Sequence, residues 1–332
     1  MSVDIDQLFS QFSKMKVAVI GDVMLDTYWW GNVERISPEA PVPVVAVSKR
    51  EKRIGGAGNV ALNVQALGTS VALLTILGDD EEGIQLKNLL REKNIDTRFI
   101  LESKKRITTN KIRIISRNQH MMRLDAEIVY DLDETDEEKL QNQIERFITI
   151  EKPDVVIFED YNKGILTKNI IRNTISFCIR NKVTTAVDPK RKNFFCYQNA
   201  TLFKPNLNEA IMGLNLLPEE ISPELLSEIH LQLKGKLDHD ISLITLSEKG
   251  IFFQEEDNKN ILPSHRRNIA DVSGAGDTVI AVASLIYTAT KDIKLAATIA
   301  NIAGGIVCEE VGTVAINKEK LLQECKRLVF DV

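Results

Sequence analysis

Short apolar runs that alternate with helical stretches are the feature that most constrains the fold of this chain. Continuous apolar runs of this length are typical of strands buried on both faces of a sheet. They lie at residues 16–21, 71–77, 154–158, 184–187, 201–204 and 241–246. Strands that alternate with helices predict parallel βαβ units, and therefore an α/β fold with a doubly wound, mostly parallel sheet. In such sheets, ligands bind at the carboxyl ends of the strands.

Two regions interrupt this alternation. Residues 41–47 (PVPVVAV) are expected to be extended, because proline is excluded from the interior of a helix. Residues 107–115 and 121–126 have the composition of two strands joined by Arg117-Asn118-Gln119. These regions predict a small second β-sheet, which either forms a lid over a site or only extends the edge of the main sheet. We therefore expect one domain over residues 1–332, with lid strands inserted at about 26–48 and 105–127.

Composition and charge argue against several classes of protein. The chain carries 42 Lys and Arg against 47 Asp and Glu, a net charge of −5. Nucleic acid or an anionic membrane would require a broad basic surface instead. No apolar stretch approaches the roughly 18 residues that span a bilayer, and the amino terminus does not resemble a signal peptide. Four widely spaced cysteines without a CxxC pair are typical of reduced thiols, so we expect a cytoplasmic protein.

A glycine turn at residues 271–278 (DVSGAGDT) carries the strongest chemical signal. Gly274-Ala275-Gly276 leads directly into an apolar helix predicted over residues 277–287. Backbone N–H groups at the start of a helix can form an anion hole for the charge on a transferring phosphoryl group. Asp277, in the first turn, can accept the proton of an attacking hydroxyl. Helix capping would also explain this Asp, but not the small residues before it.

Two further motifs are placed where a ligand could approach. Gly55-Gly56-Ala57-Gly58-Asn59 precedes a helix that ends at Gly68 and permits close approach to the backbone, although a tight turn also explains it. Asn206 and Glu209 follow the apolar run at 201–204. They either hold hydrated Mg²⁺ and phosphate oxygens or form a helix cap. Residues 55–59 lack the spacing of a dinucleotide fingerprint, and the glycine turn at residues 271–278 lacks the GKS or GKT of a Walker loop.

Charged residues gather in the predicted lid and after the first strand. Seven cations in an otherwise acidic chain indicate either an anionic substrate or a solvated face: Lys104, Lys105, Arg106, Lys111, Arg113, Arg117 and Arg123. Asp22 and Asp26 follow the first strand, where carboxylates accept hydrogen bonds from sugar hydroxyls; for Asp22 a turn role is equally compatible. His230, His239 and His265 show no partner pattern and are predicted to lie on the surface.

The motifs at 55–59 and 271–277 resemble the two signatures of the ribokinase (PfkB) family of carbohydrate kinases, and the likeness extends over nearly the whole chain. Longer stretches resemble the heptose-7-phosphate kinase branch of that family, which acts in lipopolysaccharide precursor synthesis. These stretches are residues 21–44, 111–125, 159–164, 188–190 and 204–209. The resemblance implies a ribokinase-like fold and an ATP-dependent enzyme that phosphorylates D-glycero-β-D-manno-heptose 7-phosphate at O1.

The resemblance also implies cofactors and partners. ATP and Mg²⁺ are the expected cofactors, with K⁺ as a further candidate at Asp271 and Ser273. A homodimer joined through the lid is implied as well. Many relatives are fused to a carboxyl-terminal nucleotidyltransferase, whose HxGH-type motif is absent here, so that activity is expected on a separate protein.

Individual roles follow from the same resemblance. Asp277 matches the catalytic base, and Gly274, Ala275 and Gly276 match the anion hole. The positions expected to hold the nucleotide are Asn206, Glu209, Ser247, Gly250 and Asn301, with Glu209 also reaching Mg²⁺. The expected sugar contacts are Asp26, Gly55, Gly56, Asn59, Asp160 and Lys190. The lid charge adds the hypothesis that the 7-phosphate is held by Lys111, Arg113, Arg117 or Arg123.

The chain departs from the family pattern at two places. Glu159 stands where relatives commonly have Ser, and Arg191-Lys192 follow residues 188–190 where Gly is usual. Three alternatives stay open. The chain could phosphorylate another sugar or sugar phosphate, or it could be a non-catalytic regulator that binds sugar or nucleotide. A nicotinamide-binding enzyme is disfavoured by the missing fingerprint.

Overall fold

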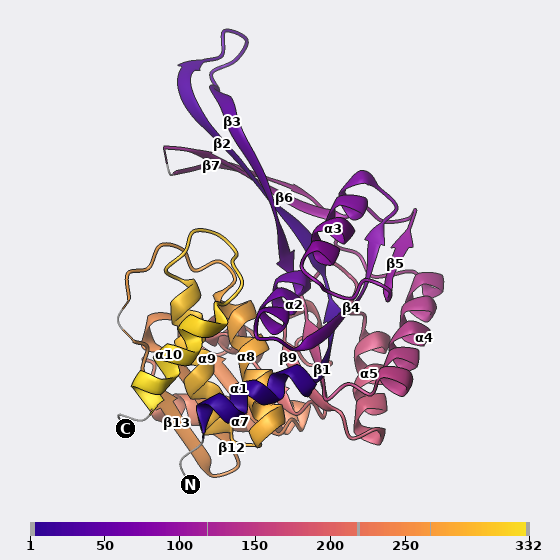
Figure 1. Cartoon of the computed structure of the whole chain (residues 1–332), viewed down its shortest axis with the longest axis vertical. Helices are drawn as coiled ribbons and strands as arrows, with labels where there is room; N and C mark the ends of the chain where they lie inside the picture. The colour runs from indigo at the N-terminus through magenta and orange to yellow at the C-terminus, as the bar shows by residue number, and fades with distance from the viewer. Residues whose placement is uncertain (1–3, 118, 218–219, 266, 330–332) are drawn as a thin grey trace.

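The structure is a computed structural model that describes residues 4–117, 119–217, 220–265 and 267–329. Asn118, in the turn expected between two lid strands, and residues 1–3 at the amino terminus lie outside the described residues. The described chain forms two sheets, a large one within the main body and a small one that projects from it (Figure 1).

The large sheet has nine strands in the order β13-β12-β11-β10-β9-β8-β1-β4-β5. All pairs from β11 to β5 are parallel, whereas β12 and β13 are added antiparallel at one edge. The strands are β1 (Lys16–Gly21), β4 (Ser70–Gly78), β5 (Ile100–Ser103), β8 (Val155–Glu159), β9 (Thr184–Asp188), β10 (Leu202–Phe203), β11 (Ile241–Thr245), β12 (Ile251–Glu255) and β13 (Asn258–Leu262). This confirms the predicted α/β class and its mostly parallel sheet.

Helices cover both faces of this sheet. Alternate residues of the central strands face opposite layers, so Val17 and Val19 of β1 pack on one core and Ala18 and Ile20 on the other. The first core includes α1 (Ile5–Gln11), α2 (Ala57–Ala66), α3 (Glu81–Glu92), α8 (Ala275–Thr290), α9 (Ile293–Val307) and α10 (Lys318–Val329). The second includes α4 (Glu134–Glu151), α5 (Lys168–Arg180), α6 (Leu207–Leu214) and α7 (Pro223–Leu237). The sheet is therefore doubly wound, as predicted.

Polar side chains fix the start of many helices. Backbone N–H groups in the first turns of α3, α4, α5, α7 and α9 donate to Asp80, Asp133, Thr167, Ser222 and Asp292, respectively. Each of these side chains satisfies a donor that has no partner inside its helix. The helix starts are thus set locally by the sequence, and those of α2, α6 and α8 lie near the carboxyl ends of the parallel strands.

The small sheet has the order β3-β2-β6-β7, with β2 (Val23–Ile36), β3 (Pro43–Gly56), β6 (Thr109–Ser116) and β7 (Gln119–Ala126). The β2–β3 and β6–β7 pairs are antiparallel, and β2 and β6 are parallel. We call these four strands the lid. The β2–β3 hairpin stands clear of the main body (Figure 1). β3 runs directly into α2, so the lid is continuous with the glycine motif at residues 55–59.

Within the described part of the chain, no helix combines the length and the apolar character needed to cross a membrane. Cys178, Cys196 and Cys325 are buried, Cys308 is half-buried, and all four are free thiols.

Candidate active site

Asp277 lies in the first turn of α8, directly after the glycine turn. Gly274 precedes the helix with φ of 79°, a left-handed conformation that favours glycine. A Cβ atom at this position would lie 2.7 Å from Nδ2 of Asn59, so the local packing also requires glycine. The turn therefore places Asp277 at the amino terminus of α8, where its side chain is only 4% exposed.

Both carboxylate oxygens of Asp277 accept hydrogen bonds. Nδ2 of Asn59, on α2, donates to Oδ2 at 2.7 Å, and the hydroxyl of Tyr161 donates to Oδ1 at 2.9 Å. Burial is the largest influence on this carboxyl and raises its pKa to about 6, although the Asn59 donor acts in the opposite direction. A carboxylate with that pKa is ionised at neutral pH and can still take a proton, as a general base must.

This geometry adds to the roles expected from the sequence. Asn59 was expected to contact a sugar, and here it holds the carboxylate of the expected base. Tyr161 was given no role, because its spacing from Asp277 in the chain carries no signal. It belongs to the stretch 159–164 that resembled the family, which was the one available hint.

Acidic and basic side chains converge at the ends of β8, β9 and β10. Carboxylate oxygens of Glu159, Asp188 and Asp277 lie within 4.8 Å of one another. Nζ of Lys204 lies 2.7 Å from Oδ2 of Asp188, and Nζ of Lys190 lies 3.3 Å from Oδ1. Burial raises the pKa of Asp188, but the two ammonium groups outweigh it and hold this pKa below its usual value. Sequence reasoning missed Lys204 as a site residue, although it ends the predicted strand at 201–204 and begins the stretch 204–209 that resembled the family.

Asn206 and Glu209 form a complete capping box at the start of α6. Backbone N–H of Glu209 donates to Oδ1 of Asn206, and backbone N–H of Asn206 donates to Oε2 of Glu209, both at 2.8 Å. The other oxygen of Glu209 pairs with Nζ of Lys190 at 2.7 Å. The capping role that the sequence left open is therefore present, and Lys190 connects Glu209 to Asp188.

The other positions expected at the nucleotide lie around the β11–β12 turn. Ser247 has φ of 54° and Gly250 has φ of 100°. A Cβ at Gly250 would lie 2.0 Å from the carbonyl oxygen of Leu262. Nδ2 of Asn301, on α9, donates to the carbonyl of Pro263 at 2.8 Å. These contacts bring Ser247, Gly250 and Asn301 into one region formed by the turn, the segment after β13 and α9.

Gly55 and Gly56 allow β2 and β3 to approach closely. A Cβ at Gly55 would lie 2.3 Å from Oδ2 of Asp26, and Gly56 has φ of 60°. Asp26 is 3% exposed and its Oδ1 pairs with the guanidinium of Arg113 at 2.5 Å. The structure thus joins Asp26 and Arg113, which the sequence analysis had assigned to different parts of the substrate.

Two lid cations, Lys111 and Arg123, are paired with carboxylates on β7 or directly after it. Nζ of Lys111 lies 3.0 Å from Asp125 and 2.9 Å from Glu127, and Arg123 pairs with Asp125 at 2.9 Å. Arg117 lies in the turn after β6, with φ of 49°. Lys111 and Arg113 are cross-strand neighbours of Asp26 and Tyr28, so these four side chains share one face of the lid.

Asp271 and Asp160, which were expected to bind a ligand, are both held by hydrogen bonds from other residues of the chain. Oδ1 of Asp271 accepts from the backbone and hydroxyl of Ser273, and Oδ2 accepts from backbone N–H of Gly312 at 2.9 Å. Asp160 is 1% exposed; the hydroxyl of Tyr197 donates to its Oδ2 at 2.8 Å, and burial, the largest influence, raises its pKa to about 7. The side chain of Asp160 thus bonds to a buried tyrosine of the core.

Asp22 is likewise a loop anchor, because its carboxylate accepts backbone N–H groups of Tyr161, Lys163 and Ile165. This arrangement fixes the loop that carries Tyr161 against the end of β1. It corresponds to the turn role that the sequence left open for Asp22.

The expectation of surface histidines was wrong for two of them. His230 and His239 are 4% and 0% exposed, and both contact the hydroxyl of Ser242. The error arose because neither residue belongs to an apolar run, whereas His230 on α7 and His239 in the connection to β11 both reach Ser242 on β11. Burial lowers the pKa of His230 to about 4 and that of His239 to about 3, so both are neutral.

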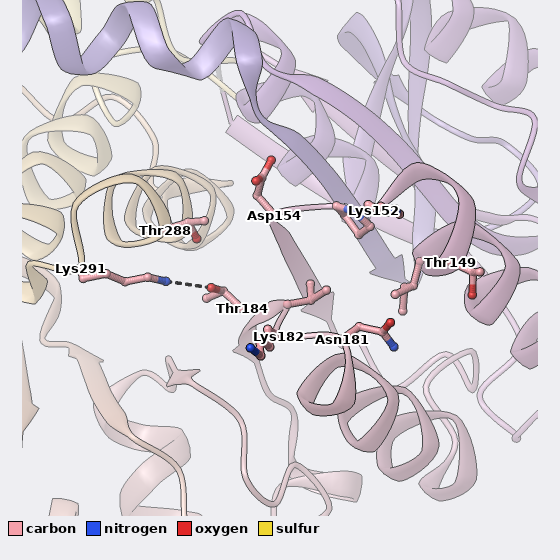
Figure 2. A pocket seen from close by; sticks show the side chains of 11 residues that line it. Thr149, Lys152, Asp154, Asn181, Lys182, Thr184, Thr288 and Lys291 are labelled. Carbon is pink, nitrogen blue, oxygen red and sulfur yellow. Dashed lines mark hydrogen bonds between the residues drawn. The ribbon is translucent and has the colours of Figure 1, made fainter.

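A pocket of about 600 Å³ lies at the opposite edge of the main sheet (Figure 2). Asp154 before β8 and Thr184 at the start of β9 line it. Lys152 and Lys291 are the C-cap residues of α4 and α8, and Nζ of Lys291 donates to Oγ1 of Thr184 at 3.0 Å. Ammonium groups at helix carboxyl termini offset the partial negative charge there. We therefore attribute these lysines to helix stabilisation; no expected site residue lines the pocket.

A buried carboxylate behind a glycine turn, at the carboxyl edge of a doubly wound sheet, is the arrangement that the sequence led us to expect of a carbohydrate kinase. The model of the pfkB family of carbohydrate kinases matches residues 14–320. The chain therefore belongs to the pfkB family.

Curated relatives carry the name bifunctional protein HldE. The chain is 38% identical to that of Sulfurimonas denitrificans over 302 residues, covering 91% of this chain and 62% of the relative. It is 40% identical to that of Actinobacillus succinogenes over 321 residues, covering 95% of this chain and 64% of the relative. The chain thus spans less than two thirds of the length of these relatives.

Solved structures share the fold. Phosphofructokinase-2 from Escherichia coli in complex with potassium has a TM-score of 0.78 at 16% identity, covering 94% of this chain and 99% of that one. Ribokinase from Arabidopsis thaliana, complexed with ribose and ATP, has a TM-score of 0.72 at 15% identity, covering 93% and 99%. These likenesses confirm the ribokinase-like fold.

Proposed function

We propose that this carbohydrate kinase transfers the γ-phosphoryl group of ATP to O1 of D-glycero-β-D-manno-heptose 7-phosphate in ADP-heptose synthesis. The observation that carries the kinase chemistry is the buried carboxylate of Asp277, held by Asn59 and Tyr161 beside the start of α8. The sugar is supported by the long stretches that resemble heptose-7-phosphate kinases and by the HldE relatives at 36–40% identity.

In this proposal, Asp277 takes the proton of the anomeric hydroxyl as the sugar oxygen bonds to the γ-phosphorus and the bond to the β-phosphate oxygen breaks. Backbone N–H groups at Gly274 and Gly276 stabilise the charge on the transferring group, whereas that of Ala275 donates to the carbonyl of Val272 at 3.3 Å. Lys190 and Lys204 lie beside Asp188 and add positive charge at the same edge of the sheet. ADP leaves with the electron pair of the broken bond.

The donor set at this edge suits Mg²⁺, which prefers carboxylate and phosphate oxygens. Glu209 and Asp188 both face Lys190, and neither oxygen of Glu159 has a hydrogen-bond partner among the described residues. Bound Mg²⁺ would neutralise phosphate charge during transfer. We also place K⁺ beside Asp271 and Ser273, where both oxygens of Asp271 accept loop hydrogen bonds as well.

We place the reaction in the cytoplasm and propose that two copies of the chain associate through the lid. Trp29, Ile112, Ile114, Met122 and Leu124 occupy one face of the lid, opposite to the charged face, and Met122 and Leu124 are 56% and 42% exposed. A nucleotidyltransferase acting later in the same route is the proposed functional partner.

A substrate panel combined with one lid variant tests this function. The specificity constant kcat/KM, measured with ATP as the donor, should be far higher for heptose 7-phosphate than for fructose 6-phosphate or ribose. In Lys111→Ala, Asp125 keeps Arg123 and Glu127 keeps Lys163, so the lid keeps its other ion pairs. If Lys111 holds the 7-phosphate, KM for the sugar should rise roughly tenfold or more, since a charged hydrogen bond contributes about 1.5–3 kcal/mol.

The KM for ATP should stay unchanged in Lys111→Ala, and Lys104→Ala serves as the exposed control. Preference for fructose 6-phosphate or ribose would refute the proposed substrate. An unaltered KM for heptose 7-phosphate would mean that Lys111 stabilises the lid but does not bind the 7-phosphate.

A further inference from the structure

Glu159 is a buried carboxylate at the end of β8 that has no hydrogen-bond partner among the described residues. The residue is 1% exposed, and neither oxygen of its side chain accepts a hydrogen bond from any described residue. An unpaired charge in a protein interior is strongly unfavourable. Glu159 therefore requires either a proton or a cation.

The surroundings of Glu159 carry excess negative charge. Oxygens of Glu159, Asp188 and Asp277 lie within 4.8 Å of one another, and Glu209 joins them through Lys190. Against these four carboxylates stand two ammonium groups, those of Lys190 and Lys204. Two negative charges are left without a partner, and one divalent cation would neutralise them.

Asp188 can accept a cation without leaving a lysine unpaired. Its Oδ2 is held by buried Lys204 at 2.7 Å, whereas its Oδ1 has only the longer 3.3 Å contact with Lys190. Lys190 has a shorter alternative, the 2.7 Å pair with Glu209. Both oxygens of Asp277 already accept hydrogen bonds, so Glu159 and Asp188 are the better placed ligands.

We propose that Glu159 and Asp188 hold one divalent cation, Mg²⁺ or Mn²⁺, before any nucleotide binds. Mg²⁺ typically takes one or two protein carboxylates and completes its shell with water and substrate phosphates, which fits two ligands here. The position also fits phosphate transfer, because a Cβ at Gly276 in the anion hole would lie 3.7 Å from Oδ2 of Asp188. The catalytic use of this cation rests on the proposed function, whereas its binding does not.

Mn²⁺ titrated into the nucleotide-free chain, with free Mn²⁺ measured by electron paramagnetic resonance, tests the site. We expect one Mn²⁺ per chain, displaced by Mg²⁺. Glu159→Gln should raise the Kd at least tenfold, because the neutral amide keeps the shape but supplies no charge. The matched control is Glu255→Gln, on β12, whose side chain accepts a hydrogen bond from Tyr287. It should bind Mn²⁺ like the parent chain.

Absence of Mn²⁺ binding by the parent, or equal binding by Glu159→Gln, would show that Glu159 does not ligate the cation and would overturn the site. Circular dichroism melting checks that each variant folds. Glu159→Asp is the second variant, and its shorter side chain should also raise the Kd. Because ATP and sugar are absent, a chain that binds Mn²⁺ but transfers no phosphate contradicts only the proposed function. An active kinase without this Mn²⁺ site contradicts only the site.

Discussion

At the scale of single residues, the orientation of Asp277 depends on contacts between distant parts of the chain. Asn59 and Tyr161 lie 218 and 116 positions away from it in sequence. The glycine turn predicted the position of the carboxylate, because a local motif sets a helix start. The partners could not be predicted, because their approach depends on how α2 and the loop after β8 pack against α8.

Tyr161→Phe should shift the pH dependence of turnover. The tyrosine hydroxyl donates to the ionised carboxylate of Asp277 and so lowers its pKa, which lies at about 6. Removing the donor raises that pKa, and the acidic limb of kcat/KM should move to higher pH. A shift of roughly 0.5–1 pH unit is expected, since one hydrogen bond contributes about 1 kcal/mol and one pKa unit equals about 1.4 kcal/mol.

Tyr287→Phe is the matched control, since its hydroxyl bonds to Glu255 on β12. Its kcat/KM profile should follow the parent. An acidic limb that stays in place in Tyr161→Phe would mean that the tyrosine does not tune the base.

At the scale of elements, the sequence predicted those features that are locally encoded. The buried strands, the glycine turn before α8 and the capping box of α6 all have local signals. The full length of the lid strands does not: β2 and β3 have 14 residues each. Residues 48–53 (SKREKR) are charged and largely exposed, so no apolar pattern marks them as a strand. Pairing with β2, not burial, keeps them extended.

Gly274 and Gly276, the two glycines of the proposed anion hole, should respond differently to alanine. Gly274→Ala should lower the free energy of unfolding by about 1–2 kcal/mol, because the left-handed backbone disfavours a Cβ. The added atom would also lie 2.7 Å from Asn59. Gly276→Ala should not destabilise the fold, since its Cβ meets Asp188 and Lys204 at 3.7 Å, an ordinary contact. Within a helix, Ala is favoured over Gly by about 0.5–1 kcal/mol.

Urea unfolding of both variants measures this difference. Equal stability of Gly274→Ala and the parent chain would contradict the described turn. A loss of stability in Gly276→Ala would mean that the first turn of α8 has no room for a Cβ at this position, contrary to the described structure.

At the scale of the whole molecule, the lid has two chemically different faces. One carries Asp26, Lys111 and Arg113, and the other exposes Met122 and Leu124. On one side the lid also contacts the loop near the active site, because Arg53 donates to the carbonyl of Val311 at 2.6 Å. The exposed apolar face is left for a second copy of the chain in the proposed dimer.

Charges placed on this apolar face should separate the dimer. The double variant Met122→Asp with Leu124→Asp should sediment with the 37.3 kDa mass of one chain, while the parent sediments with twice that mass. Leu231→Asp, an exposed position on α7, should leave the assembly unchanged. Analytical ultracentrifugation distinguishes these outcomes, and a monomeric parent at micromolar concentration would contradict association through the lid.

The central claim is that Asp277 drives transfer of a phosphoryl group from ATP to the anomeric oxygen of heptose 7-phosphate. Phosphorus NMR of the reaction mixture, with the parent chain and Asp277→Asn side by side, tests it most directly. The parent should yield ADP and a second sugar phosphate resonance coupled to the anomeric proton. The folded Asn variant should form it roughly 10²–10⁴-fold more slowly, because general-base catalysis contributes about that factor. Near-normal transfer by Asp277→Asn, or no anomeric phosphate with the parent, would contradict the account.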